Sequence, residues 1–225
     1  MIRFLPKLLV TSLLVSLWAG PATSLETVLR FDLGEIGAGS PQPADGLSVG
    51  GVTFGFTDGG VPSMSAEYGD PGVGSLTYVD GAVLLGPATG TLTLDFDVPT
   101  TLVAFGVALN TIGNVTTGFS VEIFDDTMTS LGSTDVDTQG LVAFSEGQFV
   151  HDGVPIASAV VTFSTTFPQI GGNREFAFDN LRYRVPDPPL VPVPTLRGPG
   201  LVVLLALLMA TATRSLRGRR PRSAT

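Results

Sequence analysis

Few side chains in this sequence could carry out catalysis, and their types exclude most reaction classes. The chain has no cysteine and one histidine, His151, which rules out a thiol nucleophile and a zinc site built from several His or Cys ligands. His151 stands before Asp152-Gly153 at the expected end of a strand. One base without an identified nucleophile defines no mechanism, so we interpret His151 as an exposed residue of a turn.

Paired carboxylates could hydrolyse glycosides, but the pairs in this chain stand where solvent is expected. Asp95 and Asp97 share one face of an alternating strand with threonines, and Asp125-Asp126 falls in a turn. The only tryptophan is Trp18, so no Trp-lined sugar cleft is expected after residue 24. We predict that the protein is not an enzyme, with a glycoside hydrolase as the least favoured alternative.

A different set of residues favours sugar binding without hydrolysis. Proteins bind sugars through aromatic rings combined with amides and carboxylates. Tyr68 and Tyr78, near Glu67 and Asp70, stand in segments that are expected to be loops. The alternative is that all four are ordinary surface residues, because isolated exposed aromatic side chains are common.

The elements that must position these residues are strands. Short apolar runs alternate with Gly, Pro, Asp and Asn, most clearly from Leu92 to Val98, and no stretch of residues 25–185 keeps a helical period for three turns. We expect about ten strands in an all-β, antiparallel β-sandwich that is jelly-roll-like. A hairpin is expected across Asp80-Gly81, and a bulge near Asp179-Asn180, where the alternation changes phase.

Both ends of the chain fit targeting signals. Residues 1–24 fit a secretory signal peptide, with a basic start, a short apolar run and small residues after it; a retained N-terminal anchor is the alternative. The β-sandwich domain is expected over residues 25–185, and a Pro-rich linker with a sorting motif over 186–195. Residues 196–213 are expected to form a single membrane helix. The basic tail, 214–225, stays in the cytoplasm because arginines flanking an apolar segment remain inside.

The tail resembles a known class of sorting signal. Pro192, Pro194, Thr195 and Leu196 precede a short apolar segment and the cluster Arg217-Gly218-Arg219-Arg220. This arrangement is similar to PEP-CTERM signals, and closest to the variant with a Pro-Thr-Leu core. The resemblance implies recognition by an exosortase, a membrane-embedded cysteine transpeptidase, and passage through the inner membrane to the surface or exterior of a Gram-negative cell, often together with exopolysaccharide. An ordinary C-terminal membrane anchor is the alternative.

A second, shorter resemblance concerns a metal. Phe178-Asp179-Asn180-Leu181 resembles the end of lectin-like sandwich domains that are joined to such tails. The resemblance implies a structural Ca²⁺ where the first and last strands meet, held by Asp32, Asp179 and Asn180, whose oxygen atoms suit a hard cation. The alternative is that Asp179 and Asn180 only satisfy the backbone of the bulge.

The charge of the expected domain is strongly one-sided. Between residues 25 and 185 the chain has four arginines and 19 carboxylates, a formal charge of −15. Such a domain repels nucleic acid and anionic membrane surfaces. We predict a secreted, surface-sorted, non-enzymatic protein with a structural or adhesive role in the bacterial envelope or extracellular matrix. A carbohydrate-binding, lectin-like module is the alternative.

Overall fold

The computed structural model describes residues 25–168, 172 and 174–184 of the 225-residue chain. The predicted signal peptide, Pro-rich linker, membrane helix and basic tail lie outside these residues, and so do the sorting-motif residues Pro192, Pro194, Thr195 and Leu196. Within the described part, no helix has the length and hydropathy needed to cross a membrane.

Strands make up almost all regular structure in the described residues, so the all-β, antiparallel prediction is confirmed. A four-residue helix, α1 (Leu33–Ile36), is the exception. The strands are β1 (Glu26–Leu29), β2 (Gln42–Pro43), β3 (Ser48–Val49), β4 (Val52–Asp58), β5 (Val61–Pro62), β6 (Glu67–Asp70), β7 (Val83–Pro87), β8 (Gly90–Leu109), β9 (Val115–Phe124), β10 (Ser130–Gly140), β11 (Ser145–Phe163) and β12 (Glu175–Arg184).

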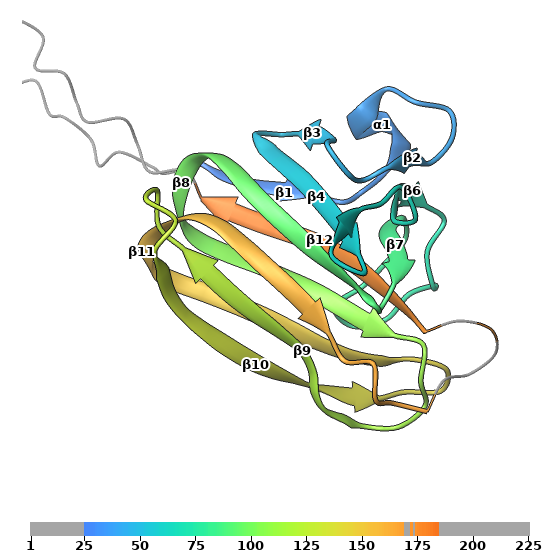
Figure 1. Ribbon diagram of the computed structural model, residues 1–225. Coiled ribbons are helices and arrows are strands. Elements are labelled where there is room, and N and C mark those ends of the chain that lie inside the picture. The colour runs from blue at the N-terminus through green and yellow to red at the C-terminus, as the bar shows by residue number, and fades with distance from the viewer. Residues whose placement is uncertain (1–24, 169–171, 173, 185–225) are drawn as a thin grey trace, which may run out of the picture. The chain divides into compact units, whose positions relative to one another are not determined.

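Two long strands, β8 and β11, run through both layers of the fold (Figure 1). β8 pairs with β4 over its first half and with β12 over its second half. β11 follows β8 through the bend, and their register is interrupted between Asp152 and Ser158. The first layer continues from β11 to β9 and β10, and the second continues from β12 to β7, β6 and β2. The arrangement is a β-sandwich with two shared strands.

The core between the layers comes from the alternation of the strands. Leu92, Leu94 and Phe96, which the alternation places on one face, are buried. Across the second layer, the ring centroids of Phe105 on β8 and Phe178 on β12 are 4.5 Å apart. Aromatic contacts of this kind stabilise the core beyond the contribution of the area that each ring buries. β8 and β12 are therefore tightly packed on their inner face.

The first strand is shorter than its alternation predicts. β1 ends at Leu29, and the buried Phe31 takes a positive φ of 58°. Asp32 then caps α1, and its side chain accepts the N–H of Glu35 at 3.3 Å. Because aspartate is a strong N-cap residue, the chain leaves the sheet there, although the apolar alternation of Leu29, Phe31 and Leu33 continues in the sequence.

A loop replaces the hairpin expected across Asp80-Gly81, and that prediction is wrong. Residues 76–79 form no strand, and β7 pairs with β12 and β6 instead. Residues 75–81, called the 75–81 loop below, lie on the outer face of the second layer. Val79 of this loop packs with Ala108 and Ala177 in a small cluster separate from the main core. The loop backbone contacts the sheet so closely that a Cβ on Gly106 would lie 2.1 Å from the carbonyl oxygen of Tyr78.

Candidate functional site

A groove lies between the 75–81 loop, the end of β10 and the start of β11. Its volume is about 320 Å³. It combines one tyrosine ring, two glutamine amides, two carboxylates and two aliphatic side chains. The lining residues are Thr77, Tyr78, Val136, Asp137, Gln139, Leu141, Glu146, Gly147 and Gln148. We call it the Tyr78 groove, because Tyr78, 37% exposed, is its only aromatic lining residue.

A buried carboxylate holds the loop at the position of Tyr78. Glu146 is 4% exposed, and both its oxygens accept backbone N–H groups: Thr77 donates to Oε1 at 3.0 Å and Tyr78 donates to Oε2 at 2.9 Å. Hydrogen bonds to an ionised acceptor are roughly twice as strong as neutral ones. Glu146 therefore fixes the backbone on one side of the groove from within the sheet.

Asp179 and Asn180 hold the other end of the same loop. The N–H of Asp80 donates to Oδ2 of Asp179 at 2.8 Å, and Nδ2 of Asn180 donates to the carbonyl oxygen of Tyr78 at 3.0 Å. Burial raises the pKa of Asp179 to about 6, against the opposing effect of the N–H groups that it accepts. The predicted bulge is confirmed, since the register shifts between Asp179 and Arg182 and Asn180 has a φ of 55°.

The other sequence-predicted sugar ligands do not join Tyr78. Tyr68 lies in β6 and is fully buried, so its predicted role as an exposed aromatic platform is wrong. Its hydroxyl donates to Glu35 at 2.5 Å, and burial together with this carboxylate raises the pKa of Tyr68. Asp70 is half-buried and accepts the N–H of Gly72 at 2.9 Å. Alternation along β6 turns Tyr68 inward and leaves its neighbour Glu67 exposed.

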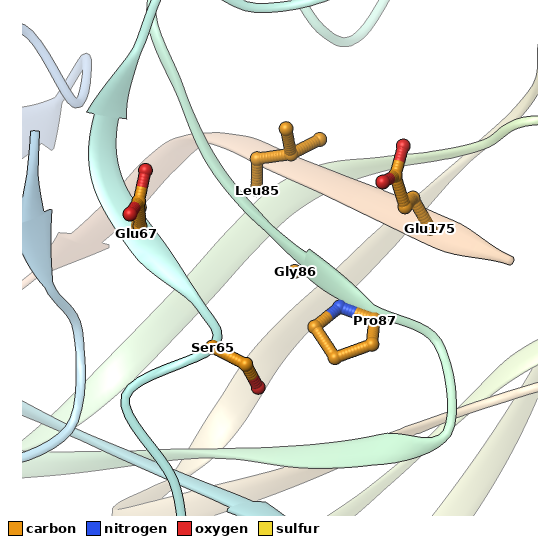
Figure 2. Close-up of a pocket in the computed structure, with 6 residues that line it drawn as sticks. All are labelled: Ser65, Glu67, Leu85, Gly86, Pro87 and Glu175. Carbon is orange, nitrogen blue, oxygen red and sulfur yellow. The ribbon is translucent and has the colours of Figure 1, made fainter. Parts of the chain in front are cut away.

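Glu67 lines a second, smaller pocket of about 220 Å³ (Figure 2). Figure 2 shows Glu67 of β6 and Glu175 of β12 on either side of Leu85, and Ser65 in the segment that leads into β6. Gly86 and Pro87 complete the lining, and none of these six residues is aromatic. This pocket offers carboxylates without a surface on which a sugar ring could stack.

The chain also contains a Gly-x-Ser-x-Gly pattern at residues 46–50. In hydrolases this pattern places the serine on a tight turn between a strand and a helix. Here Ser48 lies in β3, which leads into β4, and its Oγ shares a hydrogen bond of 2.7 Å with Oγ1 of Thr53. His151 is in β11, where its Nε2 donates to the carbonyl oxygen of Val154 at 2.9 Å. The pattern is therefore part of a hairpin.

The predicted calcium ligands have other partners in the structure. Asp32 caps α1, and the oxygens of Asp179 accept N–H groups of Asp80 and Asn180. Among the residues described here, no group of three or more His, Cys, Asp or Glu comes together as a metal site would require. Calcium binding by Asp32, Asp179 and Asn180 stays a prediction.

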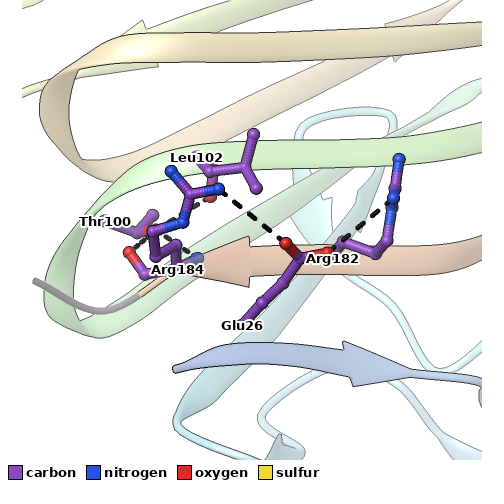
Figure 3. Close-up of polar contacts among 5 residues, drawn as sticks. All are labelled: Glu26, Thr100, Leu102, Arg182 and Arg184. Atoms are coloured by element: carbon purple, nitrogen blue, oxygen red, sulfur yellow. Dashed lines mark hydrogen bonds and ion pairs between the residues drawn. The ribbon is translucent and has the colours of Figure 1, made fainter. Parts of the chain in front are cut away.

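None of the arginines of the described part lines the Tyr78 groove. Figure 3 shows Arg182 and Arg184 beside Glu26, with N–O distances of 3.7 and 3.8 Å. Arg174 lies over the ring of Phe167, 6.0 Å from its centroid. No Arg, Lys or His lines the groove, so its fixed charges are both negative.

Sequence reasoning identified Tyr78 but missed the residues that surround it. Asp137 and Gln139 lie on β10, a polar strand that the alternation did not predict, and Glu146 and Gln148 lie at the start of β11. One weak signal was available for Glu146: a carboxylate two residues after Phe144 and three before Phe149. Charged residues are almost never buried without a partner, so such a carboxylate indicates a specific structural or functional contact.

Comparisons with known proteins give only a distant structural likeness. No protein-family model and no curated protein matches the chain. A family 29 carbohydrate-binding module from Piromyces equi is similar at a TM-score of 0.40 and 10% identity, over 73% of this chain and 93% of the module. A mutant of another family 29 module has a TM-score of 0.36 and 8% identity, over 72% and 92%. A likeness at this level carries no argument about ligand or activity.

Proposed function

We propose that this chain is an exported, non-enzymatic protein that binds polysaccharide in the Tyr78 groove, and that this binding serves an adhesive role at the cell surface or in the extracellular matrix. The observation that carries the proposal is the partly exposed Tyr78 in a groove that is also lined by Gln139, Gln148 and Asp137. Sugars combine apolar ring faces with hydroxyl groups, so an aromatic ring beside amides and a carboxylate matches both features.

The way in which the loop is held supports this proposal. Burying a charged carboxylate costs several kcal/mol unless hydrogen bonds compensate it, and this chain places Glu146 and Asp179 under one surface loop. Both carboxylates accept N–H groups of that loop. A loop fixed before binding loses little conformational entropy when the ligand arrives. Such an arrangement gives Tyr78 a defined position, which a passive surface loop does not need.

The test compares binding with and without the ring. The full-length chain in mild detergent is titrated calorimetrically with soluble polysaccharides of neutral, cationic and anionic types. Tyr78→Ala should weaken binding by about tenfold, since contact with an aromatic ring contributes about 0.5–1.5 kcal/mol beyond the area that it buries and about 1.4 kcal/mol corresponds to a factor of ten. Met64→Ala, which changes a side chain that is 76% exposed and does not line the groove, should bind as the wild type does. Equal affinities for wild type and Tyr78→Ala would refute the groove as the site.

Export is proposed from the ends of the sequence. The signal peptide at residues 1–24 and the motif with Pro192, Pro194, Thr195 and Leu196 support passage through the inner membrane and processing by an exosortase-type transpeptidase. Delivery to the surface would bring the groove to exopolysaccharide. Mass spectrometry of both ends of the native protein tests this route. A cytosolic protein with both ends intact would contradict it.

A further inference from the structure

The Tyr78 groove has fixed charges of one sign. Asp137 is exposed and lines the groove, and its Oδ1 accepts the N–H of Thr117 at 2.8 Å, which orients the carboxylate. Glu146 also lines the groove but is buried, and it accepts N–H groups of Thr77 and Tyr78. An anionic ligand would meet these carboxylates with no cationic side chain in the lining to offset them.

We propose that the groove selects glycans that carry protonated amino groups, such as 2-amino sugars without their acetyl groups, over neutral sugars, and rejects uronic acids. This inference rests on the proposed function, because it assigns a sugar class to the same groove. The exposed carboxylate of Asp137 accepts the ammonium group, and the amides of Gln139 and Gln148 are available to hydroxyl groups. A uronate would have to place its carboxylate against Asp137, where like charges repel.

The whole domain reinforces this preference at longer range. The described domain belongs to a segment with four arginines and 19 carboxylates between residues 25 and 185, which attracts a polycation and repels a polyanion. This diffuse attraction is screened over about 8 Å at physiological salt. The contribution of Asp137 itself must therefore be separated from that of the overall charge.

Asp126→Asn provides that separation, because it removes the same charge at the other end of β10. Asp126 is exposed in the turn between β9 and β10, whereas Asp137 lies near the end of β10 that borders the groove. Asp137→Asn keeps the size of the side chain and an oxygen that can still accept the N–H of Thr117. The two variants have the same net charge and differ only in where the charge was removed.

The experiment titrates the full-length chain with three hexasaccharides, of glucosamine, of N-acetylglucosamine and of galacturonic acid. We expect the glucosamine oligomer to bind most tightly, the N-acetylated oligomer more weakly, and the galacturonate oligomer not at all. Asp137→Asn should weaken glucosamine binding about fivefold at low salt, the upper range for one exposed ion pair, and leave N-acetylglucosamine binding unchanged. Asp126→Asn should change both affinities by less than about twofold.

Three results would overturn the inference, and they differ in what else they affect. Galacturonate binding as tight as glucosamine binding would refute charge selection while the proposed sugar site stands. Equal losses of glucosamine affinity in Asp137→Asn and Asp126→Asn would show that only the overall charge of the domain matters. This result would also refute the inference and leave the proposed sugar site standing. Binding of none of the three oligomers, in a chain that shows cooperative unfolding, would refute the inference together with the proposed function.

Discussion

Asp179 should make the stability of this domain depend on pH in a way that Asp179→Asn removes. The side chain is fully buried, and burial raises its pKa to about 6, with contributions from the nearby carboxylates of Asp80 and Glu35. The N–H groups of Asp80 and Asn180 oppose this rise. The native state therefore binds a proton at a pH at which the unfolded chain has already released it.

The size of the effect follows from the two pKa values. An aspartate in an unfolded chain titrates near about 3.9, and each pKa unit corresponds to about 1.4 kcal/mol, so a native value of about 6 is worth about 3 kcal/mol. Because the native pKa is the higher one, this stabilisation is fully present below about pH 3.9 and is lost as the pH rises through about 6. The free energy of unfolding of the wild type, relative to Asp179→Asn, should thus be about 2–3 kcal/mol larger at pH 4 than at pH 7.5.

Urea unfolding of the full-length chain, followed by circular dichroism between pH 4 and pH 7.5, measures this difference. Other carboxylates titrate in both proteins, so their contributions cancel when the two curves are subtracted. Asp126→Asn controls for the loss of one exposed charge and should give a curve parallel to that of the wild type. Parallel curves for wild type and Asp179→Asn would refute the reasoning, because they would mean that folding leaves the proton affinity of Asp179 unchanged.

Three more predictions concern the loop and the metal. Gly106→Ala should destabilise the domain by about 1–3 kcal/mol and abolish sugar binding, because its Cβ would lie 2.1 Å from the carbonyl oxygen of Tyr78; Gly113→Ala, which has open space around it, is the control for urea unfolding and titration. Glu146→Gln should speed amide hydrogen exchange at Thr77 and Tyr78 and cost about 1–3 kcal/mol, and unchanged exchange would contradict its role as a clamp. The predicted calcium ion should raise the melting temperature in calcium over that in chelator, since a ligand of the native state stabilises it, and equal midpoints would rule the ion out.

The sandwich could be predicted wherever a strand has one apolar face. Leu92 to Asp97 alternates because one side of β8 faces the core and the other faces solvent, and the alternation in burial ends at Val98, which is 48% exposed. β10 could not be predicted because it lacks such an apolar face. In the described structure most of its residues are exposed, and Thr138 is its one fully buried side chain. A strand that is held by pairing with β9 and buries almost nothing leaves no periodic signal in its sequence.

The hairpin prediction is wrong because backbone N–H groups of the 75–81 loop donate to side chains that are distant in sequence, and not to a partner strand. Asp80-Gly81 is a strong local turn signal, yet the N–H groups of Thr77, Tyr78 and Asp80 donate to Glu146 and Asp179. These carboxylates stand 68 or more residues away in sequence. A turn signal such as Asp80-Gly81 reflects only the preferences of neighbouring residues. It carries no information about a hydrogen-bond acceptor, such as Glu146 or Asp179, that comes from a distant part of the chain.

The same contacts explain why only Tyr78 of the groove could be predicted from the sequence. Tyr78 could be proposed from its type, but Tyr68 could be proposed equally well, and only the fold separates the buried ring from the exposed one. What distinguishes Tyr78 is the pair of buried carboxylates beneath its loop, where a charge is costly. An apolar side chain at either position would leave the N–H groups of Thr77, Tyr78 and Asp80 without these acceptors. The two carboxylates thus hold the backbone of the loop on both sides of a partly exposed tyrosine, and this fixed position of Tyr78 is the physical reason to look for a ligand in this groove.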